Sequence, residues 1–136
     1  MNIVIADSDA LIGLIYEADL LHQRSVKIFN YLQKENTYIF IPYPILLEAA
    51  TGLARIAGRA DLAAQLLKSY VNSGYKLDMS VEDLVAELYD PKTSKKNTPF
   101  DHYVLALAKK NDIKYVFSFD SFYQKNGLVL IEDLVG

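Results

Sequence analysis

Acidic side chains interrupt stretches of this 136-residue chain that are otherwise apolar. Asp7 and Asp9 lie in a run over residues 3–15 in which, apart from Ser8, every other residue is apolar or glycine. An ionised carboxylate removed from water is costly in free energy unless it is paired, hydrogen-bonded or bound to a metal. These two aspartates therefore need partners that an ordinary hydrophobic core does not supply.

Three more acids have similar settings. Glu48 lies among apolar residues, Asp101 follows Thr98 at a helix start, and Asp120 stands in the turn SFDSF. Each acid alone has an ordinary structural explanation. Asp101 fits a capping box, which stabilises a helix by about 1 kcal/mol. Asp9 and Asp120 fit caps or turns, and Glu48 fits a pair with a lysine.

The apolar periodicity predicts strands that alternate with helices. The expected strands cover residues 1–6, 38–41, 75–77, 114–119 and 128–131. The expected helices cover residues 10–16, 18–34, 45–57, 61–71, 80–89 and 99–110, two of them opened by the capping signatures Ser80-x-x-Asp83 and Thr98-Pro99-x-Asp101. This order predicts an α/β sandwich with a mainly parallel central sheet flanked by helices.

In such a sheet, ligands collect beyond the carboxyl ends of the strands. Asp7 and Asp120 follow strands, whereas Glu48 and Asp101 lie in the first turns of helices that start at the same edge. Their mutual repulsion would be destabilising without a countercharge, which a divalent cation supplies. Hard oxygen ligands favour Mg²⁺ or Mn²⁺, the ions commonly used to hydrolyse phosphodiesters.

Composition narrows the remaining options. The chain has no cysteine, which excludes disulfides and thiolate zinc sites, and we expect its two histidines, His22 and His102, to be surface or packing residues. The net charge is −3, but setting the five acids aside leaves 12 acidic residues against 14 lysines and arginines, which is compatible with a nucleic-acid substrate. We expect a single domain over residues 1–136, no membrane span, no signal peptide and a cytoplasmic location.

Four segments in register resemble the PIN domain family and, within it, the VapC-type toxin ribonucleases. These segments are IADSDALI, LLEAATGL, TPFDHYVLALAKK and VFSFDSFY. The resemblance covers essentially the whole chain and implies a PIN-like three-layer sandwich. It also implies an endoribonuclease that needs Mg²⁺ or Mn²⁺, forms a homodimer and, in the toxin branch, is inhibited by a small antitoxin protein.

The resemblance also implies roles for individual residues. The expected metal ligands and catalytic residues are Asp7, Glu48, Asp101 and Asp120. Ser8 and Ser118 stand where the family often has a small hydroxyl residue. Asp9 departs from the pattern, since asparagine or serine is commoner there, and it is either an additional ligand or a helix cap.

Two other functions remain open. DSDAL also resembles the D-x-D-x-[TV] signature of phosphohydrolases, in which Asp7 would be the nucleophile and Asp9 the acid/base. Alternatively, the chain is a non-catalytic PIN-like binding module whose acids hold a structural ion or receive a partner's arginines. For a ribonuclease, we expect the loop lysines Lys92, Lys95 and Lys96 to contact the RNA backbone.

Overall fold

A four-stranded parallel sheet forms the centre of the molecule, with the strand order β2-β1-β3-β4. The computed structural model describes residues 2–70, 75–92 and 97–135. The strands are β1 (Ile3–Ala6), β2 (Tyr38–Phe40), β3 (Tyr115–Phe117) and β4 (Val129–Leu130). The predicted α/β sandwich with a mainly parallel sheet is confirmed.

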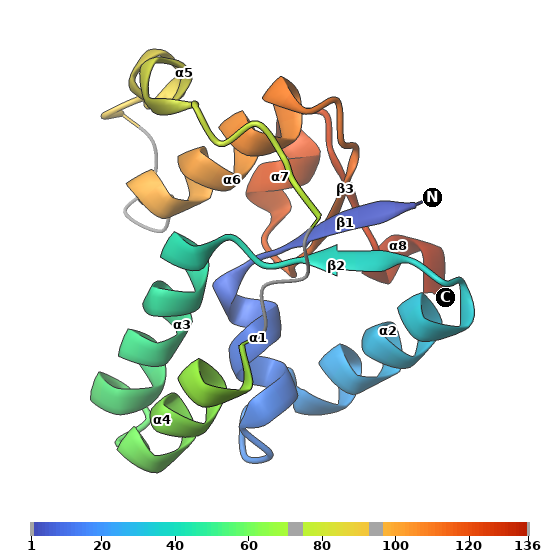
Figure 1. The fold of residues 1–136 in the computed structure, drawn as a ribbon, viewed down its shortest axis with the longest axis vertical. Helices are drawn as coiled ribbons and strands as arrows, with labels where there is room; N and C mark the ends of the chain where they lie inside the picture. Colours follow the sequence, from blue (N-terminus) through green and yellow to red (C-terminus); the bar gives the residue numbers. More distant parts are fainter. Residues whose placement is uncertain (1, 71–74, 93–96, 136) are drawn as a thin grey trace.

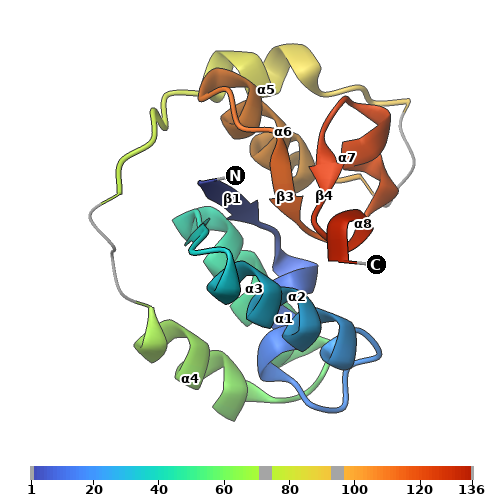
Figure 2. The ribbon, with the colours of Figure 1, turned by 90° about the vertical axis from the view of Figure 1, so that its right-hand side faces the viewer.

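Helices cover the strands on both sides, with α5 and α6 above them in Figure 1 and α2 and α4 below. The turned view in Figure 2 shows the same separation. The helices of the described residues are α1 (Ser8–Ile15), α2 (His22–Lys34), α3 (Tyr43–Arg55), α4 (Ala60–Ser69), α5 (Glu82–Leu88), α6 (Pro99–Lys110), α7 (Ser121–Lys125) and α8 (Glu132–Val135). None of these helices has the length and apolar character needed to cross a membrane.

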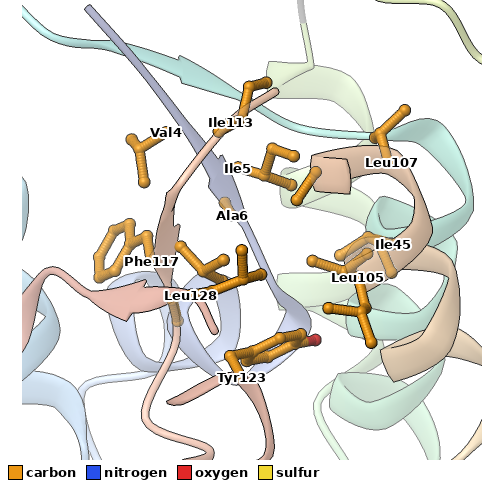
Figure 3. Close-up of a cluster of buried hydrophobic side chains, with 14 of the residues drawn as sticks. Val4, Ile5, Ala6, Ile45, Leu105, Leu107, Ile113, Phe117, Tyr123 and Leu128 are labelled. Carbon is orange, nitrogen blue, oxygen red and sulfur yellow. The ribbon is translucent and has the colours of Figure 1, made fainter. Parts of the chain in front are cut away.

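The core is built around β1, whose Val4, Ile5 and Ala6 are completely buried. Apolar residues of β3 and α6 pack around this strand in one cluster, as Figure 3 shows for Phe117 and Leu105. A strand without polar residues suits such a position, since side chains on both of its faces are removed from water. Burial of each large apolar side chain contributes about 1.5–3 kcal/mol, so the core fixes the position of the strand end that leads to Asp7.

The fifth strand expected at residues 75–77 is wrong. This segment has no regular secondary structure. The ring of Tyr75 stacks on that of Tyr38 in β2, with centroids 5.0 Å apart, and Leu77 packs against the core. The apolar residues thus cover the side chains of edge strand β2 without extending the sheet.

Two helices start later than the sequence patterns predict. Residues 18–21 form turns in which the Asp19 carboxylate accepts a hydrogen bond from the backbone N–H of Leu21, so α2 begins only at His22. Near α5, the hydroxyl and backbone N–H of Ser80 both donate to Asp78. Helix α5 therefore begins at Glu82 without a side-chain cap, and the expected Ser80-x-x-Asp83 capping signature is wrong.

Candidate active site

The register of the sheet brings the predicted acids to one edge. Ala6, the last residue of β1, pairs with Phe117, the last residue of β3, and the backbone N–H of Asp7 donates to the Phe117 carbonyl at 3.0 Å. Asp7 therefore lies beside the segment that carries Ser118 and Asp120. Helices α1, α3 and α6 start near this edge and carry the other acids.

Asp7 is buried, with 3% of its surface exposed, and caps the N-terminus of α1. Its Oδ1 accepts from the backbone N–H of Ser8 at 2.8 Å, and its Oδ2 accepts from the Tyr123 hydroxyl at 2.6 Å. Figure 3 shows the Tyr123 ring in the core with its hydroxyl near the end of β1. Tyr123 was not among the predicted site residues, although it is the last residue of the segment VFSFDSFY and lies three residues after Asp120.

Asp9 joins α1 to the segment after β3. Its Oδ2 accepts from the Ser118 hydroxyl at 3.0 Å and from the backbone N–H of Phe119 at 2.8 Å, while Oδ1 accepts from the Ala10 N–H at 2.7 Å. The Ser118 hydroxyl in turn accepts from the backbone N–H of Asp120 at 3.2 Å. Both Asp9 oxygens are thus used in bracing the site, and the N-cap of α1 is Asp7, not Asp9.

Glu48 differs from the aspartates because its Oε1 is buried without a hydrogen-bond partner. It lies in the second turn of α3, which Pro44 helps to start. Burial raises the pKa of Glu48, and the nearby Ser8 hydroxyl lowers it in part. A buried oxygen without a partner is costly, so Glu48 lacks a donor or a cation.

Asp120 caps helix α7, whereas Asp101 lies in the first turn of α6 and bonds back to Thr98, the N-cap residue of that helix. One oxygen of Asp101 accepts from the backbone N–H of Thr98 at 2.9 Å, as the capping signature predicts. Asp120 accepts from the backbone N–H of Phe122 at 2.9 Å and, more weakly, from the Asn97 amide at 3.4 Å. No sequence pattern singled out Asn97, because a loop asparagine has many ordinary roles.

The site has an excess of negative charge. Burial, followed by repulsion from Asp9, raises the pKa of Asp7 well above its usual value, even though the Tyr123 hydrogen bond acts in the opposite sense. Burial raises the pKa of Asp101 to about 6, with further contributions from Asp120 and Asp9. Burial also raises the pKa of Asp9. Four of the five acids, Glu48 included, are therefore destabilised as anions.

Among the described residues, His102 and Arg24 interact electrostatically with these acids, but neither is free to neutralise them. His102 lowers the pKa of Asp101, but its Nδ1 lies 2.9 Å from the Thr98 carbonyl oxygen and its ring packs against Phe122, so it is a packing residue as expected. Arg24 interacts electrostatically with Asp9, yet its guanidinium is paired with Glu132. A bound cation would remove the repulsion that remains.

The candidate ligands suit a divalent cation because they offer oxygen donors, not because their side chains are already arranged around a common point. All candidate donors are carboxylate oxygens, and the unpartnered Oε1 of Glu48 is available. Within the described ranges, however, no group of three or more histidine, aspartate or glutamate side chains is arranged to hold a metal ion. Several oxygens are instead directed to helix N-termini.

The other predicted residues are only partly described. Lys92 is exposed in the loop before α6, whereas Lys95 and Lys96 lie outside the described residues. His22 is half-buried, with its Nδ1 2.7 Å from the Gly13 carbonyl oxygen, so it is a boundary residue as expected. Neither histidine contributes a ligand at the sheet edge.

This parallel sheet with acids at its carboxyl edge belongs to a known class. The model of the PIN domain family matches residues 4–127, so the chain belongs to the PIN domain family. Its fold is similar to that of VapC20 from Mycobacterium tuberculosis, a toxin described as cleaving the sarcin-ricin loop. The TM-score is 0.73 at 16% identity, over 93% of this chain and 96% of that chain. No curated protein matches the sequence.

Proposed function

We propose that this protein is a divalent-metal-dependent endoribonuclease and the toxin of a toxin–antitoxin pair. The observation that carries the proposal is the group of buried, mutually repelling carboxylates at the carboxyl edge of a PIN-family sheet. Carboxylates that repel one another need a countercharge, and a divalent cation supplies it in a metal-dependent nuclease. The similarity to VapC20 supports RNA as the substrate.

We assign the binding of Mg²⁺ or Mn²⁺ to Asp7, Glu48, Asp101 and Asp120. The bound ion would lower the pKa of the attacking water and stabilise the leaving oxygen. Tyr123 keeps the Asp7 carboxylate in one orientation. Asp9 and Ser118 hold the segment after β3 against α1, which keeps Asp120 near Asp9.

The hydrogen bonds of Asp9 weigh against an aspartate-nucleophile phosphohydrolase. In that alternative, Asp9 must exchange a proton with the substrate as acid/base. Its two oxygens instead accept three hydrogen bonds, from Ala10, Ser118 and Phe119. A general acid/base needs to be within hydrogen-bond reach of the substrate, and this carboxylate is engaged elsewhere.

Replacement of Asp7 by asparagine tests the proposal. Asp7→Asn should abolish Mg²⁺-dependent cleavage of single-stranded RNA, while the protein stays folded because the substitution removes repulsion in the metal-free site. The measurements are gel-resolved cleavage and thermal unfolding by circular dichroism. The matched control is Asp61→Asn, at an exposed aspartate paired with Arg59, which should cleave at the wild-type rate.

Two results would contradict the proposal. Cleavage by purified Asp7→Asn at the wild-type rate would remove Asp7 from the catalytic group. Tight binding of a partner with no hydrolysis in Mg²⁺ or Mn²⁺ would instead favour the non-catalytic binding module.

The expected partners are part of the same proposal. We infer a homodimer, since the α3–α4 pair is rich in alanine and leucine and leaves side chains such as Leu67 partly exposed. A mass of one chain by light scattering at micromolar concentration would contradict it. We further infer a small antitoxin protein and a cytoplasmic location, which co-purification with the product of the adjacent reading frame and cell fractionation would test.

A further inference from the structure

A pocket of about 390 Å³ opens directly beside the acidic group. It lies where α1, α3 and the start of α6 meet, and these three helices carry Asp9, Glu48 and Asp101. Its lining includes Ser8, Ile12, Leu47, Glu48, Arg55 and Phe100. Two of these residues, Ser8 and Glu48, belong to the candidate active site, so a ligand in the pocket would touch the position where a phosphodiester would be cut.

The walls of this pocket are mostly apolar and open to solvent. The exposed fractions are 40% for Phe100 and 43% for Leu47, and Ile56 at the rim is 90% exposed. Gly52 also lines the pocket and has no side chain to occupy it. Exposed apolar side chains around a concave site are typical of ligand pockets, and an exposed phenylalanine ring provides a stacking surface for a base.

A positive charge stands at the same pocket. Arg55, in the last turn of α3, is exposed and forms no ion pair with any residue in the part of the chain that the structure describes. The carboxylates beside the pocket repel an anionic ligand. The positive charge of this guanidinium would attract such a ligand and hold it at the pocket. An apolar slot next to a free guanidinium matches a nucleotide, which combines a flat base with a phosphate.

We propose that this pocket receives one unstacked base of the RNA strand beside the bond to be cut, with Phe100 stacking on the base and Arg55 contacting an adjacent phosphate. The proposal rests on the proposed ribonuclease function and assigns a subsite for a single-stranded nucleotide to it. Single-stranded RNA suits the pocket, since its bases can leave the stack without breaking a duplex.

Binding and cleavage of RNA by pocket variants test the proposal. The probe is a fluorescein-labelled single-stranded 12-nucleotide RNA of mixed sequence, followed by anisotropy with Ca²⁺ and by gel-resolved cleavage with Mg²⁺. Phe100→Ala should weaken binding about 5- to 100-fold, as expected for the loss of one stacked base, and should raise KM more than it lowers kcat. Arg55→Gln should weaken binding and reduce the salt dependence by about one phosphate contact.

Matched controls lie away from the pocket. Leu134→Ala removes a side chain of similar exposure from α8, and Lys109→Gln removes a charge from the other end of α6. Both should bind and cleave like the wild type. Circular dichroism establishes that each variant is folded, and Arg55→Gln tests the pocket independently if Phe100→Ala does not fold.

The outcomes separate the subsite from the function. If the wild type cleaves RNA and both pocket variants bind and cleave like it, the subsite is wrong while the ribonuclease stands. If the wild type neither binds nor cleaves RNA, the proposed function and the subsite are both wrong. If Phe100→Ala changes only the mass measured by light scattering, the pocket is a protein interface and the proposal is overturned.

Discussion

Asp7 has two different hydrogen-bond donors, and they constrain it in different ways. The backbone N–H of Ser8 holds one oxygen as a helix cap, and the buried hydroxyl of Tyr123 holds the other. The tyrosine bond joins residues 116 positions apart in the chain. A carboxylate held at both oxygens keeps its orientation, and each oxygen retains a lone pair for a further ligand.

Removal of the Tyr123 hydroxyl tests this arrangement. Tyr123→Phe keeps the ring but leaves a buried Asp7 oxygen without its donor, which costs about 1–3 kcal/mol. We expect a lower free energy of unfolding in urea and a higher Mg²⁺ concentration for half-maximal RNA cleavage. The control is Tyr115→Phe, at the start of β3 and away from the acids. Identical urea curves and Mg²⁺ requirements for Tyr123→Phe and wild type would contradict the positioning role.

At the scale of elements, close packing of helices α1, α2 and α3 fixes the position of Ser8 and Glu48. Gly13 in α1 makes a close approach to α2 possible, since a Cβ at this position would lie 2.2 Å from the Ser25 hydroxyl and 3.3 Å from the Leu21 carbonyl oxygen. Ser25 is itself completely buried. A side chain at residue 13 would therefore force α1 and α2 apart.

Alanine at this glycine is expected to destabilise the protein. Glycine-to-alanine substitution inside a helix is intrinsically favourable by about 1 kcal/mol, but the overlap with Ser25 costs about 1–3 kcal/mol in a packed interior. Gly13→Ala should lower the free energy of unfolding, and adding Ser25→Ala should restore part of it. Gly52→Ala is the control, because its Cβ meets only the flexible end of Ile12 at 3.1 Å. Equal stability of both glycine variants in urea would refute the argument.

At the scale of the whole molecule, the acidic edge makes stability depend on pH. The pKa of Asp101 rises from 3.8 to about 6 on folding, mainly because the side chain is buried. Between these two values the folded state binds more protons than the unfolded state, so the free energy of unfolding falls as pH rises. The pKa values of Asp7, Asp9 and Glu48 are raised in the same direction.

We therefore expect the metal-free protein in EDTA to be more stable at pH 5 than at pH 7.5. Both of these pH values lie above the pKa values of Asp61 and Asp78. Folding lowers the pKa of these two aspartates, so they would change the stability in the opposite sense only at lower pH. Urea denaturation at each pH measures the difference, and Asp101→Asn should reduce it. Added Mg²⁺ should stabilise the protein most at pH 7.5, where the carboxylates are ionised. Stability that rises from pH 5 to pH 7.5 in EDTA would contradict the prediction.

Local patterns in the chain were enough to predict most of the elements. The uninterrupted apolar segment of β1, the prolines near the start of α3 and the Thr98-Pro99-x-Asp101 signature of α6 depend on neighbours in the sequence. Residues 75–77 were mistaken for a strand because a short apolar run does not reveal whether it pairs with a sheet or covers one. The start of α2 was misplaced because the Asp19 turn competes with the helix.

Residue types and their order also predicted which acids reach the carboxyl edge, since parallel strands bring their ends together whatever the details of packing. Only the tertiary structure decided how each acid is used there. It joined Tyr123 to Asp7, engaged Asp9 with Ser118 and Phe119, and left Glu48 with a buried oxygen that has no partner. These contacts connect segments about a hundred residues apart, and the distances between such segments depend on the packing of the whole core rather than on local sequence.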